Sequence, residues 1–136
     1  FHYAVASDAR LGSRELGSRT GAALTTPLVG MLTPARRPAP ARGLPPAGSF
    51  CTVSNPLVEV IHLAAARHGD GLVAYLHSLA PEETEVEISF PELNVRRMLA
   101  GTFLEREQRE VPLANGAGRL TISPGSLATV QVELGD

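Results

Sequence analysis

The stretch Thr84-Glu-Val-Glu-Ile-Ser-Phe90 decides the fold class of this 136-residue chain. Its apolar side chains, Val86, Ile88 and Phe90, alternate with polar ones, which is the period of a β-strand with one buried and one solvated face. Pro91 follows at once and ends the strand, because proline cannot donate a ladder hydrogen bond. We therefore expect an antiparallel strand here, with its glutamates in solvent.

Turn signals divide the flanking sequence into further short strands. We expect them over residues 1–6, 27–33, 49–54, 57–64, 72–79, 119–123 and 127–134, with two kinked strands rather than a helix over 95–110. Asn115-Gly116 is a strong hairpin signal, since both residues tolerate positive φ. Eight to ten short strands separated by turns predict an all-β fold, an antiparallel β-sandwich.

Two segments in the first third of the chain interrupt the strand pattern. Ser13 can cap a short helical turn near residues 13–19, and the glycines around it argue against a longer helix. Residues 34–47 contain five of the chain's 11 prolines and three arginines, which predicts an extended Pro/Arg-rich loop. We expect this loop to lie inside a single sandwich domain that covers residues 1–136.

Composition excludes several classes of protein. A net charge of −2 without a basic cluster gives no field that would attract nucleic acid or an anionic membrane. No apolar run approaches membrane-spanning length, and we expect a cytoplasmic location. The single cysteine, Cys51, cannot form an internal disulfide and is most simply a small buried hydrophobe.

Motifs that carry chemistry are missing from the sequence. It has no Gly-x-Ser-x-Gly elbow, no His-Glu-x-x-His pair and no phosphate loop. We interpret its glutamates, Glu105 among them, as solvated strand faces rather than as the paired carboxyls of a glycosidase. Aromatic residues make up only 4% of the chain and Trp is absent, which weighs against a sugar-stacking surface.

His62 and His77 are the two metal-ligand candidates. They lie on the strands of a predicted hairpin, and paired strands can bring two imidazoles together if their faces agree. Alternation places His62 on the same face as Val58 and Val60. Because no third ligand lies near them in sequence, a structural role is favoured. We assign no metal, cofactor or catalytic residue to this chain.

Six short motifs follow one another along the chain. They are Phe1-His-Tyr-Ala-Val5, Thr26-Pro-Leu28, Leu44-Pro-Pro-Ala-Gly-Ser-Phe50, Leu72-Val-Ala-Tyr-Leu76, Phe103-Leu-Glu-Arg106 and Leu120-Thr-Ile-Ser-Pro124. In this order they resemble the C-terminal part of family 38 glycoside hydrolases, the α-mannosidases, over nearly the whole chain. The chain departs from the family pattern at Ser7-Asp8, His77-Ser78 and Gly125-Ser126.

The resemblance implies a specific role. Family members are retaining α-mannosidases whose zinc site and catalytic carboxylates lie upstream of the matching region, so no site residue carries over. The chain begins at Phe1 rather than Met. We therefore expect a non-catalytic C-terminal β-sandwich of a larger hydrolase acting on α-mannosides in mannose metabolism. It would pack against upstream catalytic and β domains, with a homo-oligomer interface as a further use.

Two alternatives stay open beside this interpretation. A sandwich of this kind can serve as a stand-alone module that binds carbohydrate or protein through its loops. The other alternative is a metal-dependent enzyme that uses His62 and His77.

Overall fold

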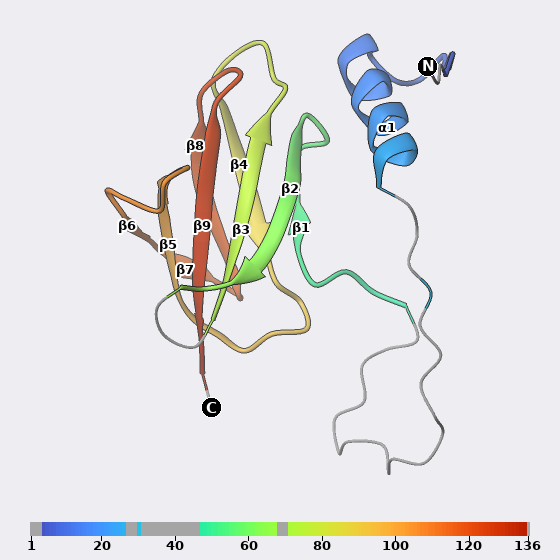
Figure 1. Cartoon of the computed structure of the whole chain (residues 1–136). Coiled ribbons are helices and arrows are strands. Elements are labelled where there is room, and N and C mark those ends of the chain that lie inside the picture. Colours follow the sequence, from blue (N-terminus) through green and yellow to red (C-terminus); the bar gives the residue numbers. More distant parts are fainter. Residues whose placement is uncertain (1–3, 27–29, 31–46, 68–70, 136) are drawn as a thin grey trace, which may run out of the picture. The chain divides into compact units, whose positions relative to one another are not determined.

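The computed structural model describes residues 4–26, 30, 47–67 and 71–135. The chain divides into two compact units, residues 1–47 and 48–136. Among the described residues, the first unit holds one helix, α1 (Ser13–Thr25), and the second holds nine strands (Figure 1). The predicted all-β antiparallel sandwich is confirmed, and its described strands all belong to the second unit.

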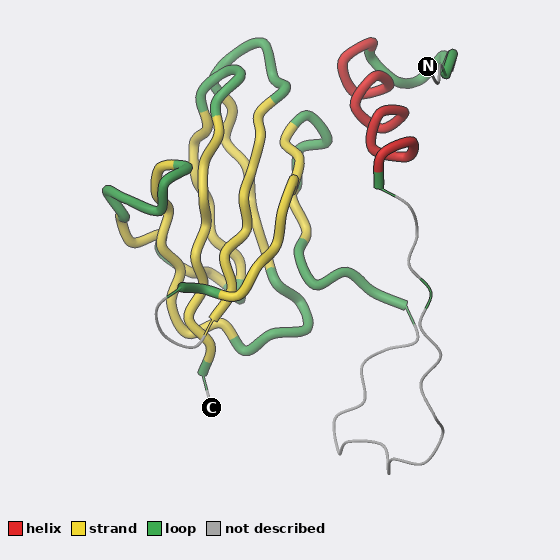
Figure 2. Tube along the Cα trace, viewed as in Figure 1, coloured by secondary structure: helices red, strands yellow, loops and turns green. Residues whose placement is uncertain are grey.

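The strands form two antiparallel sheets (Figure 2). One sheet has the order β1-β4-β8-β7 and the other the order β2-β3-β9-β5-β6. In chain order the bounds are β1 (Thr52–Val53), β2 (Val58–Ala65), β3 (Gly71–Ser78), β4 (Thr84–Ser89), β5 (Val95–Thr102), β6 (Arg109–Val111), β7 (Leu113–Ala114), β8 (Ala117–Ile122) and β9 (Leu127–Leu134).

The core lies between the two sheets and follows the alternation of the sequence. On β4, Val86 and Ile88 are buried, as is Phe90 just after the strand, so the predicted inward face is confirmed. The facing sheet contributes Leu76 from β3 and Met98 from β5, both fully buried in the same cluster. Burying a large apolar side chain contributes roughly 1.5–3 kcal/mol, so this cluster is the main source of stability.

The region between residues 95 and 110 forms two strands, β5 and β6, which confirms the kinked pair over the helix. The hairpin at Asn115-Gly116 is also confirmed, because these residues have φ of 53° and 77° and join β7 to β8. Such angles are those a tight hairpin turn requires.

A β-bulge in β2 corrects the predicted faces of that strand. Val60 pairs with Leu76, but the next pair in the ladder is His62 with Tyr75, so Ile61 is the extra residue. An extra residue reverses the alternation beyond it. His62 therefore lies on the outer face of the sheet, and the prediction that it shares a face with Val60 is wrong.

Helix α1 is longer than the helical turn predicted near residues 13–19. It runs from Ser13 to Thr25 with Gly12 as N-cap and without a side-chain cap, so the predicted capping role of Ser13 is wrong. The glycines inside the helix do not end it. A Glu15–Arg19 ion pair at 2.6 Å, one turn apart, adds a small stabilisation.

The predicted strands of the first unit are not found where that unit is described. Residues 4–6 belong to no strand. Apart from Gly30 and Ala47, the predicted strand over 27–33 and the Pro/Arg-rich loop over 34–47 lie outside the described residues. A single sandwich domain over the whole chain therefore stays a prediction.

Replacing Gly21 by alanine is expected to raise the helix content of the chain. An interior glycine costs about 1 kcal/mol relative to alanine, and a Cβ at Gly21 would meet no atom within 4 Å. Circular dichroism checks the helicity. The urea midpoint of the sandwich should not move, because no residue of α1 is buried. The matched control is Gly116→Ala, which forces alanine to φ of 77° and should cost roughly 1 kcal/mol. Lower helicity in Gly21→Ala would contradict this expectation.

Candidate functional site

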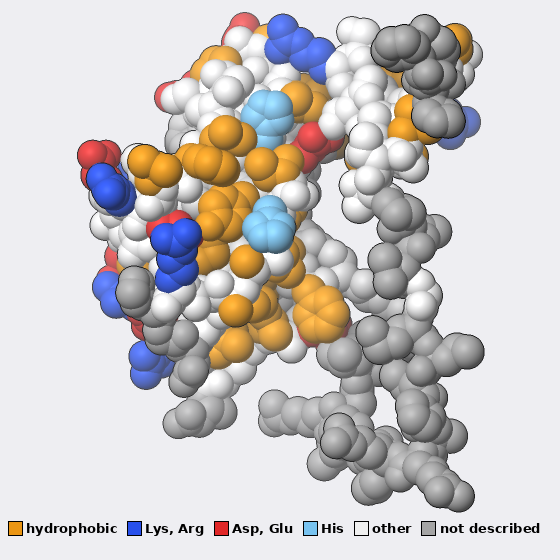
Figure 3. Space-filling view, in the orientation of Figure 1, with side chains coloured by type: hydrophobic (Ala, Val, Ile, Leu, Met, Phe, Trp, Pro, Cys, Tyr) orange, Lys and Arg blue, Asp and Glu red, His pale blue; other side chains and the backbone are white. Residues whose placement is uncertain are grey.

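The outer face of the five-stranded sheet carries a largely apolar surface. Figure 3 looks onto β2, β3 and β9, where hydrophobic side chains gather around two histidines. Val73 and Leu99 belong to this face and are buried although they lie outside the core cluster between the sheets. These buried apolar residues distinguish this face from the outer face of the other sheet, which carries exposed Glu85 and Glu87.

The loop after β5 folds back over the outer face. The Thr102 N–H donates to the carbonyl of Arg106 at 3.0 Å, and the Glu105 N–H donates to the carbonyl of Thr102 at 2.8 Å. The Thr129 hydroxyl donates to the same Thr102 carbonyl at 2.9 Å, which ties the loop to β9. A Cβ on Gly101 would lie 2.9 Å from the Arg106 carbonyl oxygen, so the close return of the loop favours glycine there.

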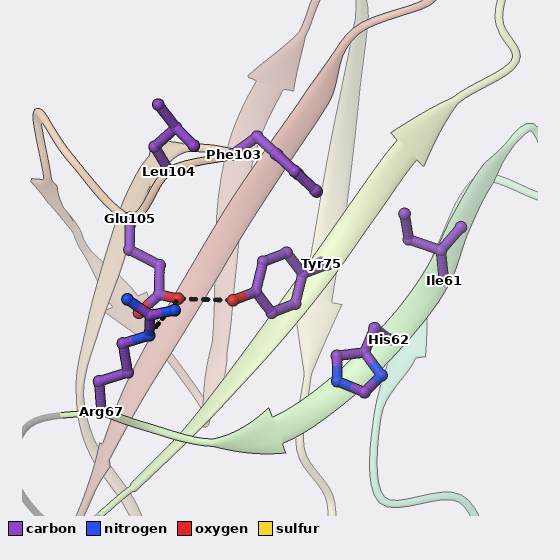
Figure 4. Close-up of a pocket in the computed structure, with 7 residues that line it drawn as sticks. All are labelled: Ile61, His62, Arg67, Tyr75, Phe103, Leu104 and Glu105. Atoms are coloured by element: carbon purple, nitrogen blue, oxygen red, sulfur yellow. Dashed lines mark hydrogen bonds and ion pairs between the residues drawn. The ribbon is translucent and has the colours of Figure 1, made fainter.

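A hollow of about 450 Å³ lies between this loop and β2, with Tyr75 from β3 among its lining residues (Figure 4). The Tyr75 hydroxyl donates to Glu105 Oε1 at 2.5 Å. Arg67 Nε lies 3.9 Å from the same oxygen. The Glu105 side chain is only 16% exposed, whereas that of Arg67 is 81% exposed. The Glu105 carboxylate thus contacts both Tyr75 on β3 and the more exposed Arg67.

Three rings meet in the hollow. The Phe103 ring stands edge-on to Tyr75, with centroids 5.5 Å apart and an interplanar angle of 69°. On the other side His62 lies 5.6 Å from Tyr75 at 44°. Figure 4 shows the Tyr75 ring broadside, with Phe103 and His62 on opposite sides of it. The Phe103–Tyr75 contact is edge-to-face, which is a favourable arrangement for two aromatic rings, and the His62–Tyr75 contact is tilted.

Two residues of this arrangement were not singled out by the sequence. Glu105 was expected on a solvated face, and this expectation is wrong, because its side chain is only 16% exposed and accepts the Tyr75 hydrogen bond. No sequence motif marked Tyr75 as a candidate functional residue. Its bond to Glu105 spans 30 residues of sequence, so no local spacing could have indicated the pair.

The Tyr75 hydroxyl is expected to ionise at higher pH than an ordinary tyrosine. The hydrogen bond to Glu105 is the main cause of its raised pKa, and desolvation and the Glu105 charge add to it. Since the folded-state pKa lies above the usual 10.0, the contact is complete below that pH and is lost as pH rises through the raised pKa.

A spectrophotometric titration checks this prediction. The difference between the chain and Tyr75→Phe isolates the tyrosinate absorbance of Tyr75. Glu105→Gln should lower the pKa, whereas the matched change Glu110→Gln should not. A Tyr75 pKa that does not respond to Glu105→Gln would contradict the assignment.

The two histidine candidates lie on the same outer face. His62 pairs with Tyr75 and His77 pairs with Glu59, so the faces of the hairpin agree as a shared site would require. His62 is packed against the ring of Tyr75. Within the described residues, no three His, Cys, Asp or Glu side chains gather closely enough to hold a metal ion.

Cys51 is half-buried and packs against the hydrophobic core, in keeping with its interpretation as a small hydrophobe. Burial raises the pKa of its thiol to about 11. The thiol is therefore protonated at neutral pH and is a poor nucleophile.

An apolar surface also lies at the edge strands β1 and β2, which lie close to one another. Val60 and Leu63 pair with the core residues Leu76 and Ala74, so they point to the core side of the sheet. They nevertheless remain 37% and 36% exposed, and Phe50, just before β1, is 45% exposed. We call Phe50, Val60 and Leu63 the open seam.

Comparison with known proteins adds no relative to this description. No family model, curated protein or solved structure matches the chain. No helix in the described part of the chain is long and apolar enough to span a membrane.

Proposed function

We propose that this chain is a non-catalytic C-terminal β-sandwich domain of an α-mannosidase-like glycoside hydrolase and that it packs against upstream polypeptide through the open seam. The order of sequence motifs suggests the family. The observation that carries the packing role is the exposure of Val60 and Leu63 on the core side of β2. Residues that point to a core are normally covered, and exposed apolar patches on soluble proteins often mark interfaces.

The energetics favour an occupant for the seam. Full burial of a large apolar side chain is worth roughly 1.5–3 kcal/mol, so covering the exposed part of each seam residue would contribute roughly 1 kcal/mol. An uncovered edge strand also offers unpaired backbone groups to a further strand. The occupant that fits is therefore an extended, apolar segment of the parent enzyme that closes the sandwich at β1 and β2.

The polar groups of the domain support binding and packing rather than bond cleavage. Glycoside hydrolysis requires two carboxyl groups on either side of the scissile bond. Among the described residues that line the Tyr75 hollow, Glu105 is the one carboxylate. On this proposal the zinc and both catalytic carboxylates belong to the upstream part of the enzyme, and the isolated chain does not hydrolyse α-mannosides.

A mixing experiment tests the proposal. The 136-residue chain and the polypeptide encoded immediately upstream are purified separately and combined. We expect a stable complex that hydrolyses an aryl α-mannoside, and no hydrolysis by the chain alone. The double variant Val60→Asp, Leu63→Asp should raise the dissociation constant of the chain for the upstream polypeptide at least tenfold. The matched control Leu127→Asp, at a site 42% exposed outside the seam, should not. Turnover by the chain alone, or equal association of all variants, would reject the proposal.

A further inference from the structure

The hollow over Tyr75 has two chemically different walls. Its apolar wall is Ile61, Phe103 and Leu104, and its polar wall is His62, Arg67 and Glu105 (Figure 4). The apolar side chains are well exposed, at 49%, 44% and 69%. A volume of about 450 Å³ lies within the range of small-ligand sites, which combine apolar lining with a few placed polar groups.

The geometry points to a saccharide site: we propose that the hollow binds one pyranose unit stacked on the ring of Tyr75. A pyranose has an apolar C–H face and a rim of hydroxyl groups. Tyr75 offers a ring that is held in place by Phe103 and by its hydroxyl bond to Glu105. A fixed aromatic ring is a good surface for stacking because little side-chain freedom is lost on binding.

The polar wall supplies partners for the hydroxyl rim. The Glu105 carboxylate accepts hydrogen bonds only, and the Arg67 guanidinium donates only. Both lie at the edge of the Tyr75 ring rather than over it, as Figure 4 shows. A sugar hydroxyl can donate to one group and accept from the other. The charge on these groups makes such bonds stronger than neutral ones.

Other ligand classes fit the hollow less well. An anion such as phosphate would face the Glu105 carboxylate, which lies 3.9 Å from the Arg67 guanidinium and already offsets its charge. A wholly apolar ligand would take water away from the charged Glu105 and Arg67 without offering either group a new hydrogen bond. Glycoside cleavage needs a pair of carboxyl groups, and the described lining of the hollow supplies Glu105 alone, so we propose binding rather than cleavage at this site.

This inference is independent of the packing role. The open seam lies on the core side of β2, whereas Tyr75 and His62 lie on the outer face of the sheet. A segment that covers the core-side seam residues therefore does not need to cover the outer face on which Tyr75 lies. Failure of sugar binding would therefore not disturb the proposed function, and failure of the upstream association would not disturb this site.

An NMR titration of the full 136-residue chain tests the site. The probe is methyl α-mannopyranoside, followed by methyl β-glucopyranoside. We expect saturable shifts in the amides of β3 around Tyr75 and of the loop after β5, with a dissociation constant on the order of millimolar, as for a single weakly held ligand.

Variants separate the stacking from the polar contacts. Tyr75→Ala should weaken binding at least tenfold, Glu105→Gln should weaken it severalfold, and Tyr75→Phe should keep most of it. Arg119→Ala, on the outer face of the other sheet, is the control and should leave binding unchanged. Each variant's spectrum confirms that it is folded.

Three outcomes would overturn the inference. The first is the absence of saturable shifts with either glycoside. The second is equal affinity of Glu105→Gln and Arg119→Ala. The third is displacement of the shifts by inorganic phosphate at lower concentration than by sugar, which would identify an anion site.

Discussion

Replacing Leu76 by alanine is expected to lower the free energy of unfolding of the sandwich by about 2–5 kcal/mol. Leu76 is fully buried at the centre of β3, which is hydrogen-bonded to β2 on one side and β9 on the other. The substitution removes its packing against both sheets and leaves a cavity that flanking strands cannot easily fill. Urea unfolding followed by circular dichroism measures the loss.

The matched control is Leu127→Ala on β9. Leu127 is 42% exposed, so the same chemical change should cost less than about 1 kcal/mol there. Equal costs at the two positions would mean that the core does not lie between the sheets as described.

Gly71→Ala is expected to destabilise the sandwich by about 1–3 kcal/mol. A Cβ at Gly71 would collide with the backbone carbonyl oxygen of Val132 and lie 3.0 Å from its carbonyl carbon. Because the obstacle is backbone rather than a movable side chain, the start of β3 must shift away from β9 where Gly71 pairs with Glu133.

Thermal or urea unfolding of Gly71→Ala measures this cost. Gly21→Ala, whose added methyl group meets no atom within 4 Å, is the control and leaves the sandwich transition where it is. A Gly71→Ala chain as stable as the wild type would show that β3 and β9 are not packed this closely.

The strands that the sequence predicts well are those whose alternation is uninterrupted. On β4 the residues Val86 and Ile88 are buried as expected, because the pleat alone decides which side chains face the core. The turn at Asn115-Gly116 is likewise local, since its positive φ angles depend on these two residues. Such features need no knowledge of the rest of the chain.

The features that the sequence does not reveal depend on distant partners or on a single irregularity. The bulge at Ile61 reverses the faces of half of β2, although nothing in the alternation marks it. The residues after β5 have a composition that favours a helix, but they form a loop in which Glu105 and Glu107 have positive φ. The pairing of Glu105 with Tyr75 exists only once that loop has folded back over the sheet.

For helix α1 the sequence predicted too little regular structure rather than too much. Its glycines lower helix propensity, and this argument predicted a single turn. The helix nevertheless extends through Gly17 and Gly21 to Thr25. Propensity is a weak guide for a segment of this length, because one or two unfavourable residues do not outweigh the hydrogen bonds of the remaining turns.

Amide hydrogen exchange along β2 gives the most direct test of the idea that this domain is completed by other polypeptide. In the chain alone, the amides of β2 should exchange faster than those of β3 and β9, because β2 is an edge strand with its seam residues in solvent. Adding the upstream polypeptide should slow exchange in β2 at least tenfold while leaving β6, at the other edge of the sheet, unchanged. Exchange in β2 that is already as slow as in β3, or that does not change on addition, would contradict the account.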